Sequence, residues 1–216
     1  MIPDGRQLMP GPTDNSAAAR TPQSRLWRIP SAARRSFVPW MEALPPLRPG
    51  ENDLTRLHPA SDVADGEVIT VSGRLTYCDG RPVRGTLVEI WNANRHGRYA
   101  HVDDPGRAPL DPLFNGEGRT ITDEDGSYAF RTILPGAYLA RPDIGRWRPR
   151  HIHFSIRGGS ARLITQLYFH GDPYNASDPG FILLGDAQPR HLATTCGDGH
   201  YGFDIVMGGT NANWFE

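Results

Sequence analysis

The sequence contains no lysine, only two cysteines and no long apolar run. All 23 basic residues are arginines, which excludes Schiff-base and P-loop chemistry because both use a lysine amine. Cys78 and Cys196 are far apart and neither belongs to a Cys-x-x-Cys pair, which argues against a thiolate metal site or a disulfide framework. Two reduced thiols are typical of a cytoplasmic protein, and we expect that location.

The charge and hydropathy patterns exclude two classes of partner. A formal net charge of −1 provides no basic field of the kind that nucleic acids or anionic membrane surfaces require. The sequence has no run of 18 apolar residues that could span a bilayer. We therefore expect no nucleic-acid partner and no membrane association.

Glycine and proline are abundant, with 24 and 20 residues respectively among 216. This composition favours short strands and many turns and argues against an all-α fold. Period-two alternation or short apolar runs predict several strands, and the segment between two of them, residues 123–126, predicts a tight hairpin turn. The predicted strands are 67–77, 86–91, 119–122, 127–131, 151–156, 163–169 and 201–207. Strands of this length without a helix-length periodic segment predict an all-β fold, a β-sandwich with long loops.

The first 45 residues differ in composition from the rest. Residues 1–24 are polar and rich in Pro, Ala and Ser, whereas residues 25–42 bring enough apolar side chains to dock onto a surface. We expect residues 1–45 to form an N-terminal arm, partly disordered or docked on the domain or on a neighbouring subunit. Residues 46–216 then form a single β-sandwich domain.

One predicted strand carries a pair of histidines two residues apart. Alternation places His151, His153 and Ser155 on one face of this strand and Ile152, Phe154 and Ile156 on the other. Two imidazoles that point the same way can converge on one metal ion, so the pattern indicates half of a mononuclear site. On this spacing alone, a pair of ordinary histidines in a hydrogen-bonded pocket is the more frequent outcome.

Long ordered motifs surround this strand and resemble the intradiol ring-cleavage dioxygenases. The resemblance runs from about residue 45 to the C-terminus. Its motifs are LVEIWNAN (87–94), GRTITDEDGSYAFRTILPGAY (118–138), WRPRHIHF (147–154) and LITQLYFHGDP (163–173). The resemblance implies the β-sandwich of that family and a non-haem Fe(III) bound by Tyr138, His151 and His153. It also implies that Arg148 stabilises an oxyanion on the substrate ring and that Gln166 lines the substrate pocket.

The resemblance fails at the second tyrosine ligand that the family places near the APLDP motif. Ungapped alignment of that motif puts Gly106 at the tyrosine's position. Water or hydroxide can take the vacant position, and we favour this. Alternatively, a side chain from Tyr99, His101, Asp103 or Asp104 fills it, or the site has changed its chemistry.

The pocket also differs from the closest family members in two residues. Ala140 stands where they carry tryptophan, and Arg150 stands where they carry a small residue. We therefore expect a ring substituent different from theirs.

By this resemblance the protein is an oxidoreductase that cleaves a catechol-type or trihydroxybenzene-type aromatic with O2 and yields a muconate-type diacid. Two alternatives stay open. One is a repurposed iron oxygenase of the same fold in secondary metabolism. The other is a non-catalytic structural subunit that supports a catalytic partner. The family also implies an oligomer, either of this chain alone or with a related chain.

Overall fold

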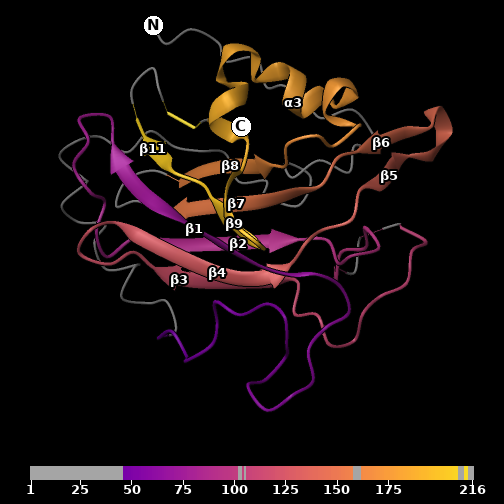
Figure 1. Ribbon diagram of the computed structural model, residues 1–216, viewed down its shortest axis with the longest axis horizontal. Coiled ribbons are helices and arrows are strands. Elements are labelled where there is room, and N and C mark those ends of the chain that lie inside the picture. The colour runs from indigo at the N-terminus through magenta and orange to yellow at the C-terminus, as the bar shows by residue number, and fades with distance from the viewer. Residues whose placement is uncertain (1–45, 102–103, 105, 158–161, 209–211, 214–216) are drawn as a thin grey trace, which may run out of the picture.

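A computed structural model shows the architecture of the chain, and the predicted N-terminal arm, residues 1–45, lies outside the part that it describes. The described residues are 46–101, 104, 106–157, 162–208 and 212–213. They form two main sheets, a short two-stranded ribbon and a helical segment near the C-terminus (Figure 1). The predicted all-β class is confirmed.

The first main sheet has strand order β11-β1-β10-β9, with β4 paired to β1. Its strands are β1 (Val68–Tyr77), β4 (Ser127–Ile133), β9 (Thr194–Gly197), β10 (His200–Gly202) and β11 (Ile205–Met207). β4 runs antiparallel to β1, whereas β10 and β11 pair with successive stretches of β1 in parallel.

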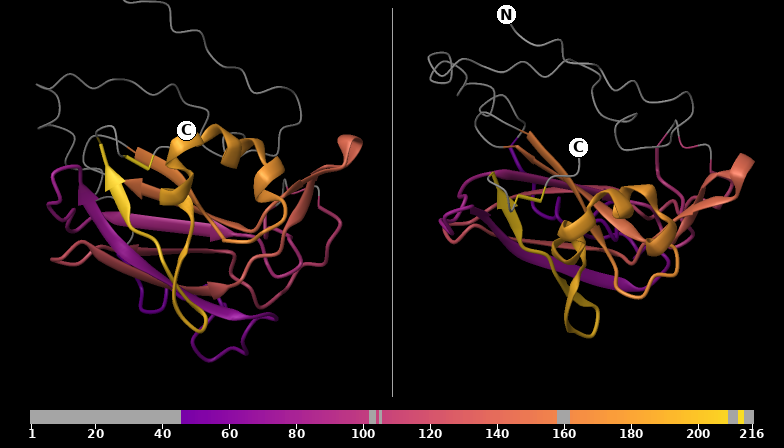
Figure 2. Two further views of the ribbon diagram at one scale, coloured as in Figure 1. Left: turned by 45° about the horizontal axis from the view of Figure 1, so that its top comes forward. Right: turned by 90° about the horizontal axis from the view of Figure 1, so that it is seen from above.

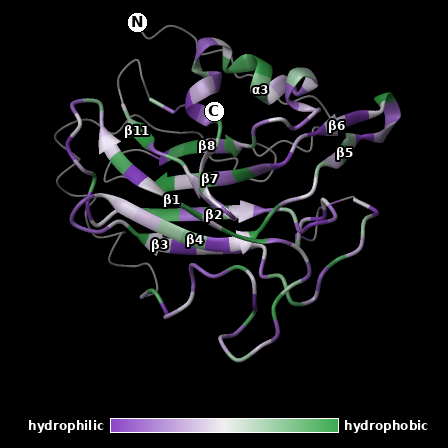
Figure 3. Cartoon of the chain, in the orientation of Figure 1, coloured by the Kyte–Doolittle hydropathy of each residue, from purple (hydrophilic) through white to green (hydrophobic). Residues whose placement is uncertain are grey.

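The second main sheet has strand order β3-β2-β7-β8, and every neighbouring pair in it is antiparallel. Its strands are β2 (Leu87–Asn92), β3 (Glu117–Ile121), β7 (His151–Arg157) and β8 (Arg162–Tyr168). Figure 3 shows apolar and polar residues mixed along β7 and β8, as expected for strands whose two faces have different surroundings.

The hydrophobic core lies between the two sheets. Apolar side chains from β1 and β4 meet those from β2, β7 and β8, and the largest fully buried ones are Phe130, Phe154, Ile69, Leu75, Ile90, Ile133, Ile152, Ile156, Leu163 and Leu167. Two sheets packed face to face over one core form a β-sandwich, and this confirms the predicted architecture.

The remaining elements lie outside the two main sheets. The ribbon of β5 (Tyr138–Arg141) and β6 (Arg146–Arg148) projects from the sandwich, joined by the 3-10 helix η2 (Pro142–Ile144), as Figures 1 and 2 show. After β8 come η3 (Asn175–Ser177), α3 (Pro179–Leu183) and η4 (Gly185–His191). α3 packs onto the outer face of β8, where the Phe181 and Tyr168 rings lie 4.9 Å apart. In the described part of the chain no helix is long and apolar enough to cross a membrane.

The hairpin predicted around residues 123–126 is wrong as a pairing of strands. The turn exists, because the Gly126 amide donates to the Asp123 carbonyl, but β3 pairs with β2 while β4 pairs with β1. Thr122 explains the separation: its side chain donates to the Val83 carbonyl and accepts from the Thr86 amide. The turn therefore connects the two sheets instead of closing one hairpin.

The strand predicted over residues 201–207 is divided into β10 and β11. Phe203 and Asp204 separate them, and the Asp204 carboxylate accepts the Arg74 amide hydrogen at 2.8 Å, where a strand would offer a main-chain carbonyl. A side chain thus replaces one rung of the ladder. β9 and the β5–β6 ribbon were not predicted because strands of three or four residues are too short to give a recognisable pattern.

The aromatic centre of the core yields a stability prediction. Phe154 is fully buried, and its ring contacts those of Tyr128, Phe130 and Phe203 at centroid distances of 5.9, 6.4 and 5.0 Å. We expect Phe154→Ala to lower the free energy of unfolding by about 3–5 kcal/mol, because it leaves a cavity between the sheets. Urea denaturation measures this loss, and a change below about 1 kcal/mol would contradict the packing described.

His191 yields a pH prediction. Its Nδ1 donates to the Gln166 carbonyl at 3.0 Å, its Nε2 is buried with no hydrogen-bond partner among the described residues, and burial lowers its pKa. Below about pH 6.5 the unfolded chain protonates this histidine while the folded chain does not. The free energy of unfolding therefore falls as the pH drops below that value.

We expect His191→Gln to reduce this pH dependence. The urea midpoint of the wild type should fall more between about pH 7.5 and about pH 5.5 than the midpoint of the variant. Identical pH dependence in the two proteins would show that His191 does not contribute.

Candidate metal centre

Strand β7 positions the two predicted histidines. Ile152, Phe154 and Ile156 fill the core face of this strand, so the register turns His151 and His153 toward the opposite face, and both are buried there. The two Nε2 atoms lie 3.2 Å apart. The pairing that the His-x-His spacing predicts is therefore present, and the remaining neighbours decide whether it forms a metal centre.

Hydrogen bonding and stacking fix the orientation of both imidazoles. His151 Nδ1 lies 2.7 Å from the Pro149 carbonyl oxygen, which can only accept, so Nδ1 carries the hydrogen and Nε2 of the neutral ring presents a lone pair. The His153 ring stacks on Trp91, its direct partner on β2, with centroids 4.8 Å apart and planes 2° from parallel. Both Nε2 atoms are thereby directed at one point.

Tyr99 supplies a phenol at the same point. Its Oη lies 3.2 Å from Nε2 of His151 and 3.2 Å from Nε2 of His153. The tyrosine follows β2 on a loop, and its main-chain amide donates to the buried Asp104 carboxylate at 2.7 Å. Asp104 also accepts the Gly106 amide at 2.8 Å, so one carboxylate folds the loop that presents this phenol.

Tyr138 adds a second phenol from the first position of β5. Its ring lies 5.8 Å from the His151 ring and 5.5 Å from the Tyr99 ring by centroids. The Tyr138 Oη is buried and has no hydrogen-bond partner among the described residues. A buried hydroxyl without a partner is costly and points to a missing ligand or ion.

The donor set fits a metal ion. Two ligands at about 2.1 Å from one metal are about 3.0 Å apart at a right angle and about 3.4 Å apart at the tetrahedral angle. The three 3.2 Å distances among Tyr99 Oη, His151 Nε2 and His153 Nε2 lie within this range. In the described part of the chain no three His, Cys, Asp or Glu side chains gather as a metal site. The donors gathered at this point are therefore two imidazoles and the phenols of Tyr99 and Tyr138.

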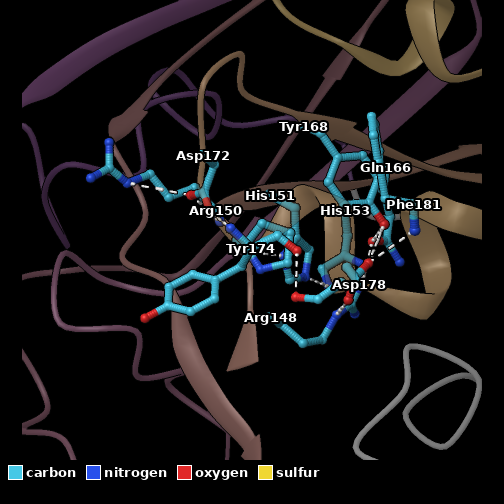
Figure 4. A network of polar contacts seen from close by, with 12 residues as sticks. Arg148, Arg150, His151, His153, Gln166, Tyr168, Asp172, Tyr174, Asp178 and Phe181 are labelled. Carbon is cyan, nitrogen blue, oxygen red and sulfur yellow. Dashed lines mark hydrogen bonds and ion pairs between the residues drawn. The ribbon is translucent and has the colours of Figure 1, made fainter. Parts of the chain in front are cut away.

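A buried polar network lies beside the histidines (Figure 4). Arg148, at the end of β6, donates from Nε to Asp178 at 3.0 Å and from Nη2 to Gln166 Oε1 at 2.9 Å. Its Nη2 also lies 3.2 Å from the Tyr168 hydroxyl. Gln166 and Tyr168 face His153 and His151 directly across the β7–β8 pair. The sheet register therefore brings the guanidinium to the same face as the imidazoles.

The charges in this network fix its protonation states. Burial by itself lowers the pKa of the Arg148 guanidinium, but the nearby Tyr138 and Asp178 outweigh burial and hold that pKa well above its ordinary value. Burial raises the pKa of the Tyr168 phenol far above its usual range, although Arg148 opposes this. Arg148 is therefore a permanent cation, and Tyr168 remains a protonated hydrogen-bond donor.

Gln166 offers one unused donor. Its Oε1 accepts from Arg148 and from the Tyr168 hydroxyl, at 2.9 and 3.0 Å, so its amide nitrogen faces away from both. That Nε2 is buried and has no hydrogen-bond partner among the described residues. Together with the Tyr138 hydroxyl, it gives the region a second polar atom that a bound molecule can satisfy.

All five site residues from the sequence analysis gather here, and Tyr99 joins them. Gly106 has no side chain that could bind a metal, as expected. The sequence analysis favoured water or hydroxide in place of the missing tyrosine, but the structure brings the Tyr99 phenol, seven residues earlier, to the histidines. Asp104 is close but bonds to the main chain of the loop instead of facing the imidazoles. Asp103 lies outside the described residues. The sequence analysis named Tyr99 only as one of four candidates, because the conformation of the loop decides which side chain lies beside the histidines.

The two departures noted in the sequence have different surroundings. Ala140 is buried and packs in a small cluster with Tyr99, Tyr138 and Ala93. The Arg150 side chain is half exposed, and its Nε lies 3.8 Å from Asp172, whereas Arg148 is directed to Asp178 (Figure 4). Only Ala140 therefore changes the space beside the donor set.

A cavity of about 630 Å³ adjoins the centre on the outer face of the second sheet. Trp91 and Tyr99 line it, whereas Tyr138, Arg148, His151, His153 and Gln166 do not. Its outer part is charged, with Arg119 bonded to Glu51 and Arg157 bonded to Glu89. A volume of this size accommodates a small organic molecule.

Comparison with known proteins places this arrangement among ring-cleaving enzymes. A family model described as Dioxygenase matches residues 43–206. The protocatechuate 3,4-dioxygenase beta chain of Burkholderia cepacia is 41% identical over 215 residues, which cover 95% of this chain and 91% of that relative. The 6-chlorohydroxyquinol 1,2-dioxygenase of Cupriavidus pinatubonensis is 37% identical over 159 residues, 68% of this chain and 56% of that relative.

A solved structure shows the same similarity. The dioxygenase domain of a dioxygenase and carbohydrate-binding fusion protein from Streptomyces sp. SirexAA-E aligns with a TM-score of 0.51 and 31% identity. The alignment covers 76% of this chain and 92% of that one.

Proposed function

Because the chain belongs to the intradiol dioxygenase family, we propose that it cleaves the ring of a small aromatic diol with O2 at a non-haem Fe(III) bound by its own residues. The observation that carries the proposal is the convergence of three donor atoms. Tyr99 Oη and the Nε2 atoms of His151 and His153 lie 3.2 Å from one another. We also propose that residues 46–216 form the catalytic unit.

We assign Tyr99, Tyr138, His151 and His153 as the iron ligands. Phenolate oxygen is a hard, strongly donating ligand that favours Fe(III) over Fe(II), and two imidazoles leave positions open for a substrate. The unpartnered Tyr138 hydroxyl supports its inclusion, because binding a metal removes the cost of burying it. Two phenolates balance most of the ferric charge within the protein.

When bound, Fe(III) supplies the electrophilic centre that holds the two diol oxygens and makes the ring reactive toward O2. Both oxygen atoms of O2 enter the diacid product, so the reaction needs no external reductant. The permanently charged Arg148 stabilises the negative charge that develops on a diol oxygen attached to the substrate ring. The free Gln166 amide donates a hydrogen bond that orients the substrate.

We propose a catechol-type or trihydroxybenzene-type substrate, the classes named for the two relatives. Ala140 packs beside Tyr99 and Tyr138, and we propose that its small side chain admits a ring substituent that a tryptophan at this position would exclude. The relative named a beta chain, by its name, belongs to an enzyme with more than one chain. Association with a related chain therefore remains part of the proposal.

We predict that the purified protein, loaded with iron, binds about one Fe(III) per chain and shows a visible tyrosinate-to-iron absorption band. Tyr99→Phe and Tyr138→Phe should each shift and weaken the band, and the double variant should lose it. Absorption spectroscopy with metal analysis measures both effects. Tyr174→Phe is the control, because the Tyr174 ring stacks on Trp147 and Tyr174 is not one of the proposed ligands. A band that survives the double substitution would refute the ligand assignment.

We predict O2 consumption in a one-to-one ratio with diol when a panel of catechols, protocatechuate and hydroxyquinols is supplied. Arg148→Gln should lower kcat by about 100-fold or more, because it removes the charge that stabilises the developing oxyanion. Arg150→Gln is the matched control on the same segment, since Arg150 is half exposed and pairs with Asp172. An iron-loaded wild type that consumes no O2 with any of these diols would overturn the proposed function.

A further inference from the structure

The Arg148 guanidinium is fixed along one edge and open at the other. Its Nε and Nη2 lie 3.0 and 3.2 Å from the two carboxylate oxygens of Asp178. Nη2 also contacts Gln166 and Tyr168, whereas no described residue accepts a hydrogen bond from Nη1. A forked pair of this kind fixes the plane of the guanidinium as well as its place. The remaining Nη1 hydrogens are available to a bound anion.

Asp178 reaches Arg148 from outside both sheets. It is fully buried, and it is the N-cap of α3, accepting the Phe181 amide at 3.0 Å. The same Oδ2 also lies 3.2 Å from the Tyr168 hydroxyl, whose single hydrogen is shared between Asp178 and Gln166 Oε1. Arg148 Nε, Arg148 Nη2 and the Phe181 amide therefore donate to this carboxylate, and the Tyr168 hydroxyl lies against it. These contacts connect the start of α3 to Arg148 and to Tyr168 on β8 (Figure 4).

From these contacts we infer that Asp178 is a positioning residue for the reaction. It orients Arg148 so that Nη1 donates to the substrate oxygen on which negative charge develops. A buried arginine without a fixed carboxylate adopts several rotamers, and displacement of a charge by about 1 Å costs much of its effect on the transition state. The inference rests on the proposed function, because it concerns the same reaction.

Asp178→Asn tests the inference with little change in volume. Asparagine has one acceptor oxygen and one NH2 group. The NH2 donor must therefore face either the Arg148 Nε donor or the donors that contact Oδ2 in the wild type. We expect kcat to fall about 10- to 100-fold, with KM within about threefold of the wild type, because orientation matters most in the transition state. The iron content and the colour should remain, since Asp178 touches none of the proposed ligands.

Asp172→Asn is the matched control. The side chain of Asp172 is also only 3% exposed and lies near an arginine, and its two oxygens accept the Tyr174 and Arg150 amides at 3.0 Å each. It does not contact Arg148. Its replacement should cost comparable stability in urea denaturation but leave kcat within about twofold of the wild type.

A double-variant cycle separates positioning from a general structural effect. In the Arg148→Gln background, Asp178→Asn should change kcat by less than about twofold, because its target is already absent. An unchanged kcat in the single variant, or an equal loss in both backgrounds, would overturn the inference while wild-type activity upholds the proposed function. A wild type inactive with every diol would instead overturn the proposed function.

Tyr168→Phe provides a second test if Asp178→Asn does not accumulate as folded protein. It removes the hydroxyl that bonds both Asp178 and Arg148 and leaves the carboxylate in place. We expect kcat to fall roughly threefold to tenfold in the wild-type background and to stay unchanged in the Arg148→Gln background. No loss in the wild-type background would contradict the role of this network.

Discussion

Strand β7 places two histidines on the face opposite the core, and the apolar side chains between them hold that register. Ile152, Phe154 and Ile156 are fully buried between the sheets, so a shift of one residue would bury the imidazoles in the core and expose the apolar set. The 3.2 Å approach of the two Nε2 atoms depends on this register. The proposed roles of Tyr99, Tyr138 and Arg148 depend on the positions of these two imidazoles.

A second constraint is the balance of charge in a buried site. Arg148 is almost fully buried, and a lone guanidinium there would be costly. Asp178 compensates that charge from α3, and Tyr168 and Gln166 satisfy further hydrogen-bonding groups. The network therefore keeps a permanent cation next to the proposed iron without leaving it unpaired. Among the described residues, the Tyr138 hydroxyl and the Gln166 amide nitrogen have no hydrogen-bond partner, which supports the proposed metal and substrate at these positions.

The sequence predicts local features well and non-local ones poorly. Alternation within β7 correctly predicted the two faces of this strand, because side-chain direction there follows from the backbone alone. The pairing of β3 and β4 with different sheets was missed, because Thr122 binds the segment before β2, far away in the sequence. Tyr99 was only one of several candidates, since the Asp104 contact that folds its loop has no sequence signature. Asp178 went unnoticed for the same reason.

The central claim is that two imidazoles and two phenols of this chain hold one ferric ion on the outer face of β7. Diffraction from crystals of the iron-loaded protein, with anomalous data collected at the iron absorption edge, tests it most directly. The account predicts a single strong peak bounded by Tyr99, Tyr138, His151 and His153. A peak at another place, or none there in iron-loaded crystals, would contradict it.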